Sequence, residues 1–486
     1  MSINLKGLTI VKALRALESG AISSVELVRT LLAAMEASQK EIHAFVTIDG
    51  EAALKQAAEC DALRAAGTKL PLLGIPIAIK DNMNVTGQPC TASSRILEGY
   101  CAPYDATVIA RLRAAGAIFL GRTNMDEFAL GSTTQTSGYG PTENPVARGC
   151  IPGGSSGGSA AAVGGDLAIC ALGSDTGGSI RQPASHCGLV GLKPTYGRVS
   201  RYGIVACASS LDQVGPMTKT VEDAALLMNV LSGRDCMDAT SLDLPVPDYT
   251  QAWANDSGTQ PLKGMTIGLP KEYFVEGLNA EVQTITNAAI DRMKSLGATV
   301  KSVSLPHSDF GIPTYYICMT AEISANLARF DGVRYGLRVP CDDVIEQYKK
   351  TRAAGFGAET KRRILLGTFV LSSGYADAYY NRAQKVRTLI RQDLEKAFKE
   401  CDILLSPVTP EPAWPLGVYQ NDPIKNYLSD VLTVGVNLAG CCAIAIPAGV
   451  TMEGKPVGVQ FIGPNFGEEV LFRAAHAFET VAKEVL

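Results

Sequence analysis

The segment from Leu72 to Ile79 (LLGIPIAI) constrains the fold of this 486-residue chain more than any other. It is short and almost wholly apolar, which predicts a β-strand buried on both faces. A sheet that contains such a strand needs helices on both of its sides. The run ends in Lys80-Asp81-Asn82, so charged and polar side chains follow directly after a buried strand.

Helix and strand patterns alternate along most of the chain. An amphipathic helix or helix pair is predicted over 8–36, broken at Gly20 and capped in its second half by Ser23 or Ser24. Further helices are predicted over 50–66, 105–115, 124–130, 277–296, 314–330, 357–372 and 374–400, with a small apolar helix inside the Gly- and Ser-rich segment 141–185. Further strands are predicted over 117–121, 167–172, 265–269, 298–304, 402–405, 442–446 and 456–462. This alternation predicts an α/β fold with helices on both faces of a sheet.

Composition excludes several classes of protein. A chain that binds nucleic acid by itself usually carries a basic surface, whereas this one has 44 basic and 48 acidic residues. The 13 cysteines show no CxxC pair and no zinc-ligand spacing, so we interpret them as reduced core residues and predict no metal site. The N-terminus lacks the apolar region of a signal peptide, and the longest apolar run, 438–450, is too short to span a bilayer. We therefore expect a soluble, cytoplasmic protein.

Familiar catalytic motifs are mostly missing. The sequence contains no GxxxxGK[ST] loop for ATP, no dinucleotide-binding GxGxxG and no HExxH. A G-x-S-x-G string occurs at Gly153–Gly157, as in the nucleophile elbow of α/β-hydrolases, but the residues before it make a poor strand. A Ser-His-Asp triad would have only His43, His186, His307 and His476 to draw on.

Ser179 is the first candidate nucleophile because it follows Asp175-Thr176-Gly177-Gly178. Two glycines let the backbone approach a substrate closely and turn several N–H groups inward. The N–H groups of Thr176, Gly177, Gly178 and Ser179 could stabilise the oxyanion that forms when a carbonyl becomes tetrahedral. A glycine turn with a capping serine is the alternative interpretation.

Lys80 and Ser155 could activate a serine nucleophile such as Ser179. Burial at the end of an apolar strand lowers the pKa of a lysine, and a neutral amine can act as a general base. A hydroxyl such as that of Ser155, which lies beside Ser156 between glycine pairs, can pass a proton between a lysine and a serine nucleophile. A salt bridge from Lys80 to Asp81 and a solvated Ser155 loop are the plainer alternatives.

These residues fall in segments that resemble the amidase signature family. Residues 153–201, with GGSSGGS at the start and SDTGGSIR from Ser174, are similar to that family's signature, and GIPIAIKDN matches the region of its catalytic lysine. The separations of 75 residues from Lys80 to Ser155 and 24 from Ser155 to Ser179 fit its Ser–cis-Ser–Lys triad. The resemblance implies that Ser179 is the nucleophile, that Ser155 follows a cis peptide and relays a proton, and that Lys80 is the base.

The resemblance also implies the architecture. It covers essentially the whole chain and predicts one amidase signature domain over 1–486, with a mixed central sheet sandwiched between helical layers. N-terminal helices would occupy about 1–66, the signature core about 72–220, and a C-terminal part with the substrate pocket about 265–486. No boundary divides the chain further, and 238–264 is expected to cross the surface.

Within the family, segments such as FDGVRYG and GVQFIGP resemble the glutamine-hydrolysing subunits of glutamyl-tRNA(Gln) amidotransferases. By that resemblance Arg363 would bind the carboxylate of glutamine, Asp430 its amino group, and Tyr315 would be a further contact. The charges suit an amino acid, which offers one anion and one cation. One departure is Cys441-Cys442, where Leu-Pro is expected.

The same resemblance implies a heterotrimer. One partner chain would bind ATP, magnesium and the mischarged tRNA, a second, small partner chain would wrap the pair, and this chain would need no cofactor of its own. Three alternatives stay open: a stand-alone amidase for another small amide, an α/β-hydrolase that uses Ser155 with a histidine, and a non-catalytic binding scaffold.

Overall fold

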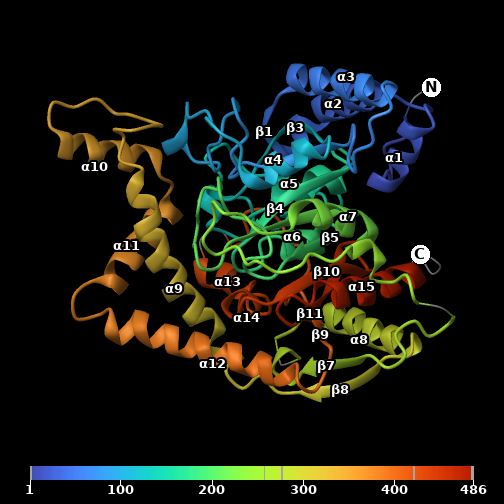
Figure 1. The fold of residues 1–486 in the computed structure, drawn as a ribbon. Helices are drawn as coiled ribbons and strands as arrows, with labels where there is room; N and C mark the ends of the chain where they lie inside the picture. The colour runs from blue at the N-terminus through green and yellow to red at the C-terminus, as the bar shows by residue number, and fades with distance from the viewer. Residues whose placement is uncertain (1–2, 257, 275–276, 420–421, 483–486) are drawn as a thin grey trace.

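A mixed, eleven-stranded β-sheet forms the centre of the protein in the computed structural model, which describes residues 3–256, 258–274, 277–419 and 422–482 (Figure 1). The strand order is β1-β3-β2-β4-β6-β5-β10-β11-β9-β7-β8. The strands are β1 (Phe45–Ile48), β2 (Pro76–Lys80), β3 (Ile118–Thr123), β4 (Cys170–Asp175), β5 (Val190–Lys193), β6 (Gln213–Thr218), β7 (Thr266–Pro270), β8 (Thr299–Val303), β9 (Ile403–Pro407), β10 (Cys442–Val450) and β11 (Pro456–Gly463).

Helices flank this sheet on both faces, which confirms the predicted α/β class (Figure 1). Those that pack on the strands include α5 on β2 and β4, α6 on β5 and β10, α7 on β6, and α8 and α15 on β10 and β11. The helices are α1 (Ile10–Glu18), α2 (Ser24–Ile42), α3 (Gly50–Ala65), α4 (Thr107–Ala114), α5 (Gly157–Gly164), α6 (Arg181–His186), α7 (Val221–Leu231), α8 (Ala280–Ser295), α9 (Gly311–Asn326), α10 (Val344–Gly355), α11 (Ala358–Leu371), α12 (Arg382–Ala397), α13 (Pro423–Leu428), α14 (Val434–Ala439) and α15 (Glu468–Ala482).

β2 is the strand predicted from the apolar run, and all five of its residues are buried. It begins at Pro76 rather than Leu72, because the chain before it forms a turn in which Leu72 and Gly74 donate to the carbonyls of Ala115 and Gly116. β3 and β4 pair with it in parallel on either side. The strand therefore lies inside the sheet, as its composition predicts.

The N-terminal helices agree with their pattern. The predicted break at Gly20 separates α1 from α2, and Ser23 caps α2 in a capping box with Glu26. The predicted helix over 124–130 is wrong. Only Glu127–Ala129 form a single 3-10 turn, in which Phe128 and Ala129 have positive φ angles of 51° and 62°. The Asp126 carboxylate accepts the backbone amides of residues 133, 134 and 136, which folds this segment back on itself.

Helices α9 to α12 extend from one side of the sheet as an arm (Figure 1). α11 packs along α9 so closely that a Cβ at Gly367 would collide with the Thr320 carbonyl oxygen, so this crossing requires glycine. A separate apolar cluster that includes Phe128, Phe330 and Phe356 lies beneath the arm. This cluster joins α9 and α12 to residues outside the arm and so packs the arm against the body of the protein.

The cysteines behave as the composition suggests. All 13 are free thiols and ten of them are buried. Cys441 and Cys442 lie in the core, where Cys442 donates to the Pro464 carbonyl. Across the described part of the chain, no helix combines the length and apolarity needed to cross a membrane.

Candidate active site

The candidate catalytic residues meet at one edge of the sheet. β2 and β4 are adjacent parallel strands, so their carboxyl ends lie side by side. Lys80 is the last residue of β2, and Ser174 and Asp175 end β4. Ser155 lies just before α5, and Ser179 lies in the turn between β4 and α6. In α/β sheets, ligands commonly bind just beyond the carboxyl ends of the parallel strands.

Lys80 Nζ has three hydrogen-bond partners, which a neutral amine can satisfy if the Ser155 hydroxyl donates to it. Its Nζ lies 2.7 Å from Ser155 Oγ, 2.8 Å from Ser156 Oγ and 3.2 Å from the Ser174 carbonyl oxygen. The Ser174 oxygen can only accept, and the Ser156 hydroxyl donates its own proton to that oxygen at 3.1 Å. A neutral amine has two N–H groups for these acceptors, which leaves its lone pair for the proton of Ser155.

The surroundings of Lys80 favour this neutral form. The side chain is fully buried, and burial lowers the pKa of Lys80 to about 7, although Asp126 and other buried acids act in the opposite direction. Asp81 contributes little because its carboxylate is engaged elsewhere. It pairs with Arg122 at 3.4 Å and accepts hydrogen bonds from Thr91 and Ser93. The plainer alternative, a Lys80–Asp81 salt bridge, is therefore wrong.

Ser155 follows a cis peptide bond after Gly154, as the family resemblance implies. A Cβ at Gly154 would collide with the Asp126 carboxylate, so the approach of these two segments needs a glycine. Ser155 and Ser156 are both fully buried, which excludes a solvated loop. No strand precedes Ser155 between residues 147 and 154, so the nucleophile-elbow interpretation fails.

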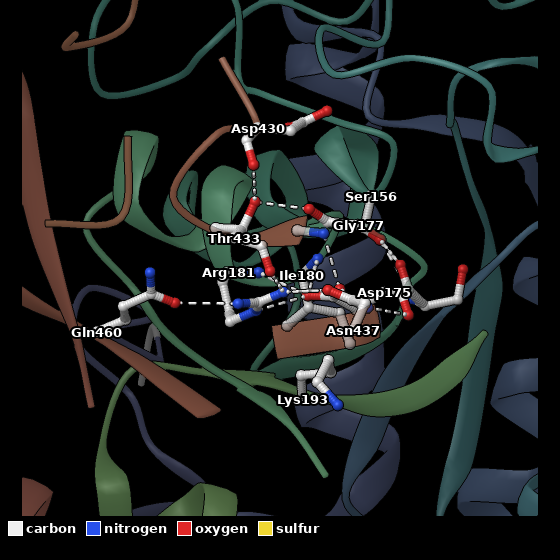
Figure 2. Close-up of polar contacts among 12 residues, drawn as sticks. Ser156, Asp175, Gly177, Ile180, Arg181, Lys193, Asp430, Thr433, Asn437 and Gln460 are labelled. Carbon is white, nitrogen blue, oxygen red and sulfur yellow. Dashed lines mark hydrogen bonds and ion pairs between the residues drawn. The ribbon is translucent and has the colours of Figure 1, made fainter. Parts of the chain in front are cut away.

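The turn that carries Ser179 is held by a buried ion pair (Figure 2). Arg181 contacts both carboxylate oxygens of Asp175, at 3.1 and 3.2 Å, and extends further hydrogen bonds to Asn437 and Gln460. Burial opposes ionisation of Asp175, but the Arg181 guanidinium holds the pKa of that carboxyl to about 2. Removing one partner of such a pair leaves an uncompensated buried charge. The pair therefore fixes the turn in one conformation.

The backbone amides of this turn are not equivalent. The Gly178 amide already donates to Asp175 Oδ1 at 2.8 Å, which leaves the amides of Thr176, Gly177 and Ser179 as the better oxyanion donors. Gly178 has a φ of +140°, a conformation that other residues rarely adopt. The Thr176 hydroxyl is held by Asp212 at 2.7 Å.

Ser179 lies beside the lysine cluster without yet joining it. The Ser156 amide donates to the Ser179 carbonyl at 3.2 Å, and Ser179 is 8% exposed, whereas Ser155 and Lys80 are inaccessible. No hydrogen bond joins the hydroxyls of Ser155 and Ser179 among the described residues, so proton transfer between them requires a rotation of a side chain. Exposure of Ser179 alone suits the residue that would meet a substrate.

Arg363 lines a pocket of about 230 Å³ together with Ser132, Glu359, Arg362 and Tyr427. Arg363 is only 4% exposed, so it is not the surface charge that its neighbours Lys361 and Arg362 would suggest. Its Nε donates to Glu359 at 2.7 Å. Although burial alone would lower the pKa of Arg363, nearby Tyr316 and Glu359 raise it, so the guanidinium stays charged.

Asp430 is the second charged group of this region. It is 7% exposed and accepts a hydrogen bond from Ser132, a pocket residue, at 2.6 Å. Burial raises the pKa of Asp430 to about 7, with the Ser132 hydrogen bond and Arg363 acting against the shift. Thr433 Oγ1 lies 2.6 Å from the Gly177 carbonyl and 3.0 Å from the Asp430 carbonyl, and so ties Asp430 to the catalytic turn (Figure 2).

Tyr315 also lies at the catalytic turn. A Cβ on Gly177 would come within 2.7 Å of the Tyr315 hydroxyl, so this tyrosine covers the backbone of the candidate oxyanion donors. Arg363 and Asp430, in contrast, share no direct contact within the described ranges. The structure thus brings Lys80 and Ser155 together, with Ser179 beside them and Tyr315 against Gly177. Arg363 lines the pocket, and Asp430 is bonded to the pocket residue Ser132.

The histidines offer no alternative base. His43 contacts the Pro141 carbonyl, His307 pairs with Asp393, His186 packs edge-on against Trp414, and His476 stacks on Trp253. Since Ser155 is bound to Lys80, a Ser155–His hydrolase does not fit this structure. Over the same described ranges, no three His, Cys, Asp or Glu side chains gather in a way that could hold a metal ion.

The chain belongs to the amidase family, because the model of that family, described as Amidase, matches residues 26–472. The chain is therefore an enzyme, and its fold is of the α/β class. Among its relatives is a protein from Geotalea daltonii that is named as one of the subunits of glutamyl-tRNA(Gln) amidotransferase. The two are 54% identical over 459 residues, which cover 94% of each chain.

Solved structures agree with this assignment. The crystal structure of the corresponding glutamyl-tRNA(Gln) amidotransferase subunit from Thermotoga maritima has a TM-score of 0.81 and 39% identity, and the match covers 99% of this chain and 96% of that one. The peptide amidase from Stenotrophomonas maltophilia also has a TM-score of 0.81, at 30% identity, and covers 98% and 97%. The fold is thus shared by amidases with different substrates, whereas identity is higher with the amidotransferase subunit.

Proposed function

We propose that this chain is the glutaminase subunit of a glutamyl-tRNA(Gln) amidotransferase, which hydrolyses the side-chain amide of glutamine and releases ammonia for a partner subunit. The observation that carries the proposal is the Lys80 Nζ–Ser155 Oγ contact of 2.7 Å. A pocket lined by the buried Arg363, whose lining residue Ser132 bonds the buried Asp430, supports it. The high identity to proteins named as subunits of that enzyme supports the choice of substrate.

The proposed chemistry begins once a side-chain rotation brings the hydroxyls of Ser155 and Ser179 into hydrogen-bond contact. Ser155 passes its proton to the neutral Lys80 amine and takes the proton of Ser179 as the Ser179 oxygen attacks the amide carbon. The amides of Thr176, Gly177 and Ser179 stabilise the oxyanion. Collapse of the tetrahedral intermediate returns a proton through Ser155 to the leaving nitrogen, which departs as ammonia. Water then hydrolyses the acyl-Ser179 ester and releases glutamate.

The rest of the reaction is assigned to partners. This chain has no P-loop and no excess of basic residues, so ATP and magnesium would bind to a partner subunit that holds the mischarged tRNA as well, and a second, small partner would complete a heterotrimer. The word subunit in the relatives' names supports such an assembly. The chain itself would require no cofactor, because a serine, a serine and a lysine suffice for amide hydrolysis.

Co-purification from the native cell tests the assembly. We expect the tagged chain to bring down two partners, one nucleotide-binding and one small, and the complex to hydrolyse glutamine faster when charged tRNA is present. A glutaminase assay with and without that tRNA measures the second expectation. A chain that purifies alone and hydrolyses other amides better than glutamine would instead support the stand-alone amidase.

Substrate selection can be tested within the pocket. If Arg363 binds the carboxylate and Asp430 the ammonium group of glutamine, Arg363→Ala and Asp430→Ala should each lower kcat/KM. A buried charged contact of this kind corresponds to about 2–4 kcal/mol, or roughly 30- to 1000-fold. Steady-state kinetics of glutamine hydrolysis measure the loss. Unchanged kinetics in both variants would exclude this role for the two residues and favour the stand-alone amidase.

A further inference from the structure

Arg363 is held on several sides within the protein. Its Nε donates to Glu359 Oε1 at 2.7 Å, and its guanidinium carbon lies 4.9 Å from the ring centres of both Tyr316 and Tyr427. Its Nη1 lies 3.6 Å from the sulfur of Met319. In the part of the chain that the structure describes, Nη2 has no hydrogen-bond partner. The contacts of Glu359, Tyr316, Tyr427 and Met319 therefore fix the direction in which Nη2 of Arg363 points.

Glu359 is the centre of this arrangement, because the same Oε1 also accepts a hydrogen bond from the Tyr427 hydroxyl at 2.6 Å. Glu359 and Arg363 are four residues apart on α11, whereas Tyr427 belongs to α13. Burial opposes ionisation of Glu359, but the Arg363 guanidinium and the Tyr427 hydroxyl lower the pKa of Glu359 below its usual value. Glu359 is therefore an ionised group that joins two separate helices.

The link extends to Asp430, the second charged group proposed to bind the substrate. Asp430 comes three residues after Tyr427, and the chain between them turns tightly, with the Asp430 amide donating to the Tyr427 carbonyl at 3.3 Å. Contacts thus run without a break from Arg363 through Glu359 and Tyr427 to the backbone of Asp430. On the far side, Ser132 holds the Asp430 carboxylate. Within the described residues Glu359 is the one side chain that hydrogen-bonds both Arg363 and Tyr427, whereas Tyr316 contacts both through its ring.

We propose that Glu359 is a positioning residue that sets the separation between Arg363 and Asp430, and thereby makes the site selective for amides that carry an α-amino acid group. This inference rests on the proposed function and adds a selectivity determinant to it. An amino acid presents its carboxylate and ammonium on one carbon, so the two protein charges must lie at a fixed spacing to bind both. Glu359 supplies that constraint without touching the reacting atoms.

The experiment uses the full chain purified with its partner subunits. Glu359→Ala should raise KM for glutamine by roughly tenfold or more, as expected when one partner of a buried charge pair is removed, with a smaller change in kcat. Glu359→Gln should recover most of the wild-type KM, because its amide oxygen can still accept from Arg363 and Tyr427. Tyr427→Phe keeps the ring and should give a rise in KM between these two.

Two controls separate positioning from folding. Labelling of Ser179 by a short alkyl fluorophosphonate, which has neither carboxylate nor ammonium, should proceed at the wild-type rate in every variant. Glu395→Ala removes a matched but exposed pair with Arg391, also four residues apart on a helix, and should leave KM unchanged.

Several results would overturn the inference. KM within twofold of wild type in Glu359→Ala would show that Arg363 needs no such support. A lower KM would show that Glu359 competes with the substrate carboxylate, and labelling that falls in parallel with glutamine turnover would show a merely structural role. A wild-type complex that is labelled at Ser179 but does not hydrolyse glutamine would instead overturn the proposed function itself, and the inference would fall with it.

Discussion

Ser179→Ala is expected to abolish glutamine hydrolysis while the protein stays folded. The substitution removes the one atom proposed to form a covalent bond with the substrate. Loss of a nucleophile of this kind lowers kcat by roughly 10⁵-fold or more. The fold should survive because the Ser179 turn is held by Asp175 and Arg181, which the substitution leaves in place. Glutamate release by the purified complex and thermal unfolding of the variant measure the two parts of the prediction.

The identity of the acylated residue is a separate question, since Ser155 is also a serine at the site. Trapping with a fluorophosphonate followed by peptide mass spectrometry should place the adduct on Ser179, the more exposed of the two. Ser179→Ala should not be labelled, and it provides the matched control. An adduct on Ser155 would reverse the two roles. Complete resistance of the wild-type protein to labelling would support the non-catalytic scaffold instead.

Much of the fold could be predicted because the spacing of apolar residues in the sequence matches the residues that are buried in the structure. β2 was recognisable from its apolar run, and α2 from its capping serine, since both signals depend on residues close in sequence. β1, β5 and β6 were not predicted. β1 and β5 have four residues each, and β6 (QVGPMT) has six but lacks an apolar run. What makes these segments strands is their pairing with other strands of the sheet.

The helix predicted over 124–130 failed for a related reason. Its apolar residues suit a helix, but the Asp126 side chain captures amides up to ten residues away and competes with the helical hydrogen bonds. The same carboxylate lies against Gly154, so this unpredicted turn helps to shape the catalytic centre.

The residues of the candidate site that lie in recognisable sequence motifs could be predicted. Lys80, Ser155 and Ser179 lie in segments with a strong family resemblance, and the physical argument for a buried lysine needed only the strand before it. Ser132, which bonds Asp430 across 298 positions of sequence, has no local signal. Glu359 did have one, its spacing of four residues from Arg363 on a helix, but that spacing is common on exposed helices and indicates function only once burial is known.

Lys80→Arg is expected to be nearly as inactive as Lys80→Ala. A general base contributes about 10²- to 10⁴-fold to the rate, and both variants should lose that contribution, because a guanidinium stays protonated and cannot accept the proton of Ser155. Arginine is also too large for a fully buried site in which Nζ already lies within 3.2 Å of three partners. Glutamine hydrolysis and fluorophosphonate labelling measure the loss. A Lys80→Arg variant with a large share of wild-type activity would show that Lys80 supplies only positive charge.

The pH profile tests the same base without a mutation. Burial lowers the pKa of Lys80 to about 7, and the amine is active only after it loses its proton, so activity must rise with pH and level off above that value. Asp430 has a pKa of about 7 as well and must be ionised to bind an ammonium group, so kcat/KM for glutamine should rise more steeply than one proton allows. The fluorophosphonate lacks an ammonium group, and its labelling rate should therefore follow Lys80 alone, about tenfold per pH unit below the pKa. A labelling rate that stays level from about pH 5 to about pH 9 would rule out a neutral Lys80 as the base and leave the proton of Ser179 without an acceptor.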